Sequence, residues 1–77
     1  MKKQKPQNWE AKVKGLLKAE LKRRDITYQE LAQKLATAGI VETPENIANK
    51  ISRGKFSAMF LVQCLEVIGC QTISLAD

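Results

Sequence analysis

The sequence predicts a compact all-α domain of four to five short helices, followed by a short extended segment at the C-terminus. Apolar residues recur at helical spacing in four segments of the 77-residue chain. A residue suited to capping a helix N-terminus opens each segment, and a glycine closes each of the last three. The capping residues are Asn8, Thr27, Thr43 and Ser57, and the glycines are Gly39, Gly54 and Gly69. With 44% apolar residues, the chain can form one small core, and we expect a single domain over residues 8–77.

The first seven residues, MKKQKPQ, carry three lysines and no side chain that a core would bury. We expect them to form a flexible basic arm ahead of the domain. Such an arm either follows the backbone or minor groove of DNA or serves only as a solubilising tail.

A first helix is expected from Trp9 to about Arg24. The apolar side chains of its inward stripe are Val13, Leu16, Leu17 and Leu21. The lysines on its opposite side are Lys14, Lys18 and Lys22. Because these lysines are one turn apart they repel each other mildly, and they either contact a polyanion or extend separately into water. Glu10 and Glu20 are interpreted as surface residues of this helix.

The start of the second helix is specified by a capping box. Thr27 and Glu30 are spaced so that each side chain accepts a backbone N–H near the helix start. The helix should end near Ala38. Ile40 and Val41 are then expected to tuck under the domain before the third helix begins.

The third segment, TPENIANKISR, has one apolar and one polar face. Thr43 caps it, and Pro44 suits the first helical position. At about 100° per residue, Ile47 and Ile51 fall on the same side. The opposite side carries Asn46, Asn49 and Arg53, flanked by Glu45 and Lys50. Because Asn pairs with adenine edges, and Arg or Lys with guanine edges or phosphate, this face suits a DNA major groove; the alternative is a face that only meets water.

The fourth helix follows Ser57 and is apolar on nearly every side between residues 59 and 68. Such a helix is either central in its fold or shared with a partner subunit. We expect a homodimer contact through helix 58–68 and the 71–75 tail. The tail, QTISL, is interpreted as a short strand or an extended segment that packs back or pairs with a second chain.

The net charge of +5 is concentrated in the first third of the chain. Residues 1–24 carry nine Lys or Arg against two Glu, whereas residues 25–77 carry four against six acidic residues. A basic segment attracts nucleic acid, but it also attracts acidic membranes or proteins.

The residue types present argue against several classes of protein. The chain has no histidine, and Cys64 and Cys70 are its only cysteines, so a zinc site lacks ligands; both are interpreted as buried, reduced thiols. We expect no cofactor, no small-molecule substrate and no enzyme, because there is no nucleophile with a base and no clustered carboxylate pair. Without a membrane-spanning run or a secretory signal, a cytoplasmic protein is expected.

Three stretches resemble a known family. The run ITYQELAQKL (26–35) resembles the I-T-Q-E-E-L-A-E-K-L opening of the second helix in Cro and C1 repressor-type, or lambda repressor-like, helix-turn-helix domains. KISRGK (50–55) resembles their R-I-E-N-G-K close of the third helix, and residues 61–69 take the place of their L-x-x-I-A-x-x-L-G. This resemblance implies a helix-turn-helix fold over residues 16–69. A narrower resemblance is to a small bacterial family with the signature K-I-S-R-G-K-F-S, and it suggests a fold more firmly than a function.

The resemblance implies a small bacterial transcriptional regulator that binds double-stranded DNA with helix 43–53 as its recognition helix. The DNA contacts it implies are Gln29, Thr43, Glu45, Asn46, Asn49, Lys50, Arg53, Lys55 and Ser57. The alternative function is a protein-interaction module, adaptor or antitoxin-like, on the same scaffold. The chain departs from the repressor pattern at two places: Tyr28 stands where glutamine is common, and the connection before the third helix is several residues longer than the usual tight turn.

Overall fold

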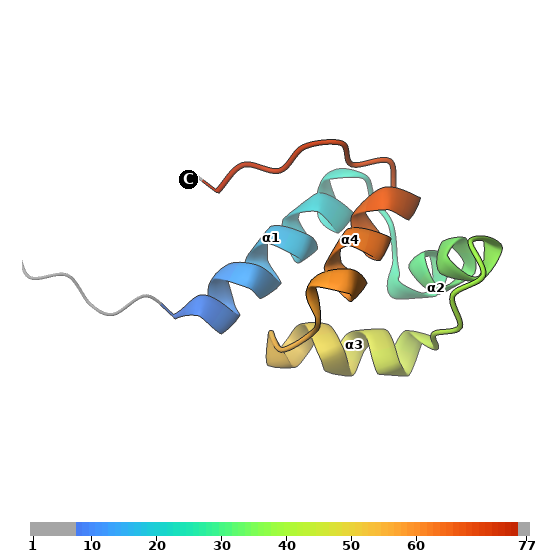
Figure 1. Ribbon diagram of the computed structural model, residues 1–77, viewed down its shortest axis with the longest axis horizontal. Coiled ribbons are helices and arrows are strands. Elements are labelled where there is room, and N and C mark those ends of the chain that lie inside the picture. The colour runs from blue at the N-terminus through green and yellow to red at the C-terminus, as the bar shows by residue number, and fades with distance from the viewer. Residues whose placement is uncertain (1–7, 76–77) are drawn as a thin grey trace, which may run out of the picture.

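The computed structural model describes residues 8–75, which form four helices around one core (Figure 1). The helices are α1 (Trp9–Arg23), α2 (Tyr28–Thr37), α3 (Pro44–Arg53) and α4 (Ala58–Val67). The all-α prediction is confirmed, with four helices and no strand in the part of the chain that the structure describes. The predicted arm, residues 1–7, lies outside that part. Within residues 8–75, none of the helices combines the length and apolar character needed to cross a bilayer.

Each helix begins after the capping residue that the sequence predicts. The side chains of Asn8, Thr43 and Ser57 each accept a 3.0 Å hydrogen bond from the backbone N–H three residues further on. Thr27 and Glu30 form the complete capping box, with hydrogen bonds of 3.1 Å to Thr27 Oγ1 and 2.9 Å to Glu30 Oε1. These bonds satisfy N–H groups that a helix leaves unpaired, so the local sequence sets where each helix starts.

The core is built from one apolar stripe of each helix. Its main side chains are Leu17 and Leu21 of α1, Leu31 and Leu35 of α2, Ile47 and Ile51 of α3, and Phe60 and Cys64 of α4. α3 packs against α1 and α2, and α4 packs against the same two helices. Burying one such side chain contributes about 1.5–3 kcal/mol. Since α2, α3 and α4 have only ten residues each, this packing rather than helix propensity stabilises them.

The connection between α2 and α3, residues 38–43, corrects one prediction. Ile40 packs against the core as expected, but Val41 is 92% exposed, so its predicted burial is wrong. The backbone N–H of Ile40 bonds to the Leu35 carbonyl at 2.9 Å, which closes the end of α2 and leaves the next side chain pointing outward. Glu42 then turns inward: its side chain is 11% exposed, and its carboxylate lies 2.5 Å from Lys50 Nζ.

Glu20 is a second correction, because it is buried rather than a surface residue; Glu10 is exposed as expected. The Glu20 carboxylate bonds to Arg23 at 2.6 Å and to Arg24, both near the C-terminal end of α1. The hydrogen bonds from Arg23 and then Arg24 hold the pKa of Glu20 below its ordinary value. The carboxylate therefore stays ionised although little of it meets water.

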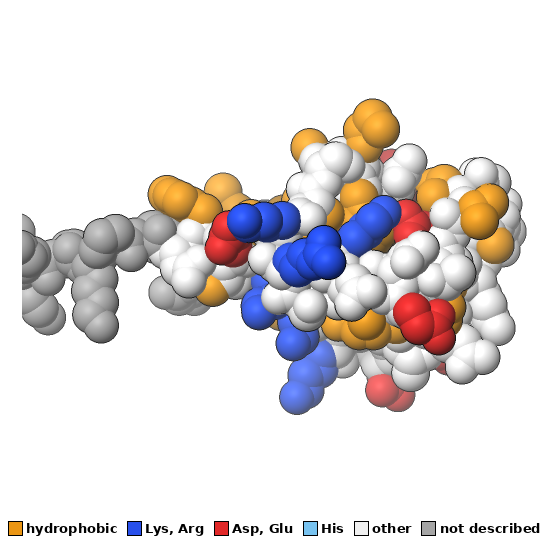
Figure 2. Space-filling view, turned by 90° about the horizontal axis from the view of Figure 1, so that it is seen from below, with side chains coloured by type: hydrophobic (Ala, Val, Ile, Leu, Met, Phe, Trp, Pro, Cys, Tyr) orange, Lys and Arg blue, Asp and Glu red, His pale blue; other side chains and the backbone are white. Residues whose placement is uncertain are grey.

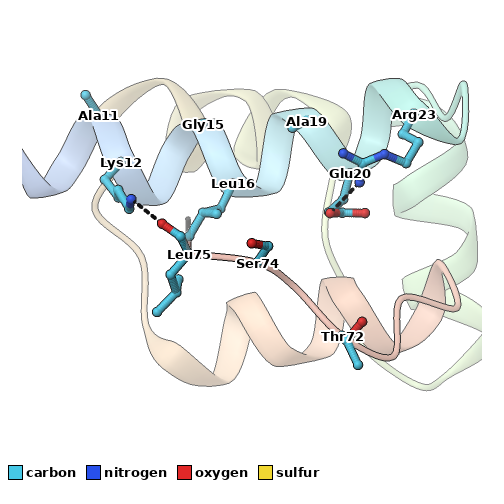
Figure 3. Close-up of a pocket in the computed structure, with 10 residues that line it drawn as sticks. All are labelled: Ala11, Lys12, Gly15, Leu16, Ala19, Glu20, Arg23, Thr72, Ser74 and Leu75. Carbon is cyan, nitrogen blue, oxygen red and sulfur yellow. Dashed lines mark hydrogen bonds and ion pairs between the residues drawn. The ribbon is translucent and has the colours of Figure 1, made fainter. Parts of the chain in front are cut away.

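The C-terminal tail, residues 71–75, is extended and packs back over α1 (Figure 1). Lys12 Nζ donates a 2.6 Å hydrogen bond to the Leu75 carbonyl. A groove of about 570 Å³ lies between the tail and the side of α1 that carries Ala11, Gly15 and Ala19 (Figure 3). Of the two predicted forms of this segment, the structure contains the extended tail.

The two cysteines are both free but differ in burial. Cys64 is fully buried as predicted, whereas Cys70 is only half-buried, and its Sγ lies 3.2 Å from the Thr72 carbonyl. Burial, together with the nearby Glu42 carboxylate, raises the pKa of the Cys64 thiol to about 12. The Cys64 thiol is therefore protonated at neutral pH and is not a nucleophile.

Candidate nucleic-acid interface

α3 divides into a buried face and an exposed face, as its sequence predicts. Ile47 and Ile51 are fully buried. The exposed residues are Glu45, Asn46, Asn49, Ser52 and Arg53. At about 100° per residue, Glu45, Asn49 and Arg53 follow one another a turn apart along the helix, on the side opposite the two isoleucines. We call these three residues and Asn46 the outer face of α3.

The side chains of this outer face are available to a ligand. Within residues 8–75, no hydrogen bond or ion pair engages the side chains of Asn46, Asn49 or Arg53; the two asparagines use only backbone groups. Each amide therefore offers a donor and an acceptor, and the guanidinium offers five donors. The acidic Glu45 near the helix N-terminus and the basic Arg53 near its C-terminus also match the helix dipole, so part of their role is to stabilise α3.

The two lysines expected to contact DNA differ in their surroundings. Lys50 is committed to the fold: its Nζ lies 2.5 Å from Glu42 Oε2 and 4.6 Å from the centre of the Phe60 ring. Lys55 Nζ lies 3.3 Å from Glu10 Oε2, with both side chains largely exposed. An exposed pair of this kind contributes little, so Lys55 can exchange Glu10 for another anion, whereas Lys50 cannot leave Glu42 without leaving its carboxylate unpaired.

The remaining expected contacts lie at helix N-termini. The Thr43 and Ser57 hydroxyls accept backbone N–H groups of α3 and α4, so each retains its own O–H as a donor. Gln29 is exposed in the first turn of α2. The structure thus places Thr43 with the outer face of α3, and Gln29 and Ser57 at the starts of the neighbouring helices.

A row of cations on α1 reaches the end of α3. Lys14 Nζ donates a 3.2 Å hydrogen bond to the Ser52 carbonyl, so Lys14 is held against α3 rather than extending into water. Lys18 and Lys22 continue the row and are exposed. Figure 2, which views the molecule from the α3 side, shows Lys and Arg side chains at the centre of this face and in a column toward its lower edge. These three lysines are not among the nine expected DNA contacts. Their spacing in the sequence indicates a row along one side of α1. The packing of α1 on α3 brings that row close to the outer face of α3.

The close approach of α1 and α3 depends on Gly54. Its φ is +65°, and a Cβ placed there would lie 2.4 Å from the Glu10 carbonyl oxygen. The first turn of α1 therefore lies directly against the end of α3 at a position where no side chain fits. This contact sets how the lysine row stands relative to the outer face.

Comparison with known proteins identifies the family but no characterised relative. A family described as a domain of unknown function, DUF6471, matches residues 9–73, which include all four helices. No curated protein and no solved structure matches the chain. The chain belongs to the DUF6471 family.

Proposed function

We propose that this protein binds double-stranded DNA with α3 as its recognition helix. The observation that carries the proposal is the outer face of α3, where two amides and a guanidinium stand exposed without partners in the described chain, next to the lysine row of α1. A ten-residue helix is about 15 Å long, and the major groove of DNA is about 12 Å wide and admits a helix.

Each side chain of the outer face has a base or phosphate that suits it. Asn49, at the middle of the line, suits an adenine edge, and Asn46 beside it can do the same. Arg53 suits a guanine edge or a phosphate, and Glu45 suits a cytosine amino group. The groups suited to phosphate are Lys55, the hydroxyls of Thr43 and Ser57, and the side chain of Gln29.

We further propose that α2 and α3 act as a helix-turn-helix pair of the lambda repressor type, in a small transcriptional regulator that binds as a homodimer. A dimer reads two half-sites and gains specificity from their spacing. Met59 and Val62 of α4 are 70% and 57% exposed, and they form an uncharged apolar surface that a second copy of the chain would cover. Because the tail packs on α1 of its own chain, α4 is the surface we propose for the dimer.

The same α4 surface supports a second candidate function, a protein-interaction module. In that case Met59 and Val62 bind a different protein, and the charges of α3 serve only to stabilise the helix. The partner should co-purify through high salt and nuclease treatment. Its loss on nuclease treatment would point back to nucleic acid.

The test of DNA binding is titration of labelled duplexes at several salt concentrations. Affinity should fall steeply with salt, and Arg53→Ala should weaken binding to a selected site by about 1–3 kcal/mol. Lys34→Ala is the matched control, since this exposed lysine lies beside Thr37, Ala38 and Val67 and belongs neither to the expected contacts nor to the lysine row of α1. If the wild-type protein does not bind duplex DNA even at low salt, the proposal is wrong. Selection from random sequences would then show whether the preferred site is two-fold symmetric.

A further inference from the structure

A hollow beside the lysine row has the features of a binding site that none of the expected contacts explains. It has a volume of about 320 Å³ and lies between the C-terminal half of α1 and the start of α2. Its lining residues are Lys18, Leu21, Lys22, Ile26, Thr27 and Tyr28. We call it the α1–α2 hollow.

The α1–α2 hollow combines an apolar floor with a cationic rim. Leu21 is buried, and Ile26 and Tyr28 are half-buried against the core, so the floor is fixed by packing. Lys18 and Lys22 stand exposed at the rim, and neither forms an ion pair within residues 8–75. The Tyr28 hydroxyl likewise has no hydrogen-bond partner in this part of the chain. Two like charges one turn apart repel each other, and a bound anion would remove that repulsion.

The lysine row that lines the hollow also reaches the end of α3. Lys14, one turn before Lys18, bonds to the Ser52 carbonyl at the end of α3, so the lysine row connects α3 to the hollow. Figure 2 shows that Lys and Arg side chains gather at the centre of the α3 face and in a column toward its lower edge. A polyanion that follows the lysine row away from the end of α3 would therefore reach the hollow.

We propose that the α1–α2 hollow seats the sugar–phosphate backbone of one DNA strand, beside the major groove that takes α3. Lys18 and Lys22 bind adjacent phosphates, Tyr28 donates its hydroxyl to one of them, and the deoxyribose lies on the floor formed by Ile26 and the tyrosine ring. This inference rests on the proposed function and adds the strand contact that orients the protein on the duplex.

A nucleic-acid strand fits the hollow better than an acidic protein segment does. The cations of α1 recur once per turn, at positions 14, 18 and 22, which matches a polymer with regularly spaced charges. In a nucleic-acid strand each sugar is bonded to a phosphate, so a sugar can lie on the apolar floor while its phosphate meets the neighbouring cations.

Salt dependence of duplex binding tests the lysines. Each phosphate contact contributes about 0.9 to the slope of log affinity against log salt concentration. Lys18→Gln and Lys22→Gln should each reduce the slope by about that amount and weaken binding about tenfold near 0.1 M salt. Lys34→Gln, the matched control, should leave both unchanged. All three lysines are exposed, so the variants should fold, and removing Lys18 or Lys22 should leave the melting temperature unchanged or slightly higher because repulsion is relieved.

The tyrosine and the strand are tested separately. Tyr28→Phe should weaken binding about threefold to tenfold without changing the salt slope, because the hydroxyl is uncharged. Replacing single phosphates of the duplex by uncharged methylphosphonates should identify adjacent positions that matter for the wild-type protein and no longer matter for the Lys18→Gln, Lys22→Gln double variant.

Three outcomes would overturn the inference, and they are distinguishable. If Arg53→Ala loses site preference while the Lys18 and Lys22 variants behave like Lys34→Gln, the protein binds DNA but not through the hollow. If the wild-type protein binds no duplex at about 50 mM salt, the proposed function itself fails. If a poly-glutamate peptide binds as tightly as duplex DNA and the same two variants weaken it, the hollow takes an acidic protein segment instead.

Discussion

Gly54→Ala should destabilise the protein more than any other glycine-to-alanine change in the four helices and their connections. The left-handed conformation at φ +65° costs an alanine about 1–2 kcal/mol. The new Cβ would also lie 2.4 Å from the Glu10 carbonyl oxygen and 2.8 Å from its carbonyl carbon. Since these atoms are backbone, they cannot rotate away, and α1 must shift from α3. Overpacking of this kind costs about 1–3 kcal/mol, which brings the expected loss to about 2–5 kcal/mol.

Two other glycines make it possible to distinguish the cost of the Cβ contact with Glu10 from the cost of the left-handed backbone conformation. Gly39 has φ +84°, but a Cβ there meets nothing within 4 Å, so Gly39→Ala should lose only the conformational part, about 1–2 kcal/mol. Gly15 lies inside α1 with open space around it, so Gly15→Ala should stabilise the protein by about 0.5–1 kcal/mol.

Urea unfolding followed by circular dichroism gives the three free energies of unfolding. The loss for Gly54→Ala should exceed the loss for Gly39→Ala by about 1–3 kcal/mol. In a domain of this size, each kcal/mol shifts the melting temperature by about 4–8 °C, so thermal scans should rank the variants in the same order. Equal losses for Gly54→Ala and Gly39→Ala would refute the close contact between α1 and the end of α3.

Three further predictions concern charged and thiol groups. Lys50→Met should lower the free energy of unfolding by about 1–2 kcal/mol in urea titrations, because it leaves the Glu42 carboxylate, 11% exposed, without its cation; no loss would mean that this carboxylate is solvated. Since the folded pKa of Glu20 is lowered, its contribution to stability is complete above its ordinary pKa of 4.5 and is lost as the pH falls from that value through the lower pKa of the folded state. Glu20→Gln should therefore flatten the acid side of the stability–pH profile, and an unchanged profile would contradict the cause given for the shift. In native protein near pH 8, mass spectrometry after alkylation should find one modified thiol, Cys70, because burial raises the pKa of Cys64 to about 12; modification of Cys64 at the same rate would show that its site opens readily.

Local sequence was enough to place the helix starts and the inward face of α3, whereas in α1 only Leu17 and Leu21 of the predicted inward stripe lie in the core; Val13 and Leu16 do not. Capping residues interact with backbone groups only three positions away, so Thr27 and Thr43 specify their helix starts without reference to the rest of the chain. Helical periodicity likewise identifies Ile47 and Ile51 as buried and Asn49 as outward. These features depend only on residues a few positions apart in the chain, so they can be predicted from the sequence.

Tertiary packing decided the features that depend on distant neighbours. Val41 looked like a core residue but is exposed, because the turn that closes α2 directs Glu42 inward to Lys50. Glu20 looked like a surface residue but is covered, and it remains charged through the neighbouring Arg23 and Arg24. Neither outcome follows from residue type, since burial is set by what the fold brings over a side chain.

The sequence by itself determined an all-α chain with an amphipathic third helix, because capping and periodicity act over a few residues. Only the tertiary structure decided which surface lies beside that helix. It placed Lys14 against the end of α3 and formed the α1–α2 hollow from residues of two helices. The physical reason is that a binding surface is a property of distances between elements, and those distances are set by packing, as at Gly54, where α3 meets α1 with no room for a side chain.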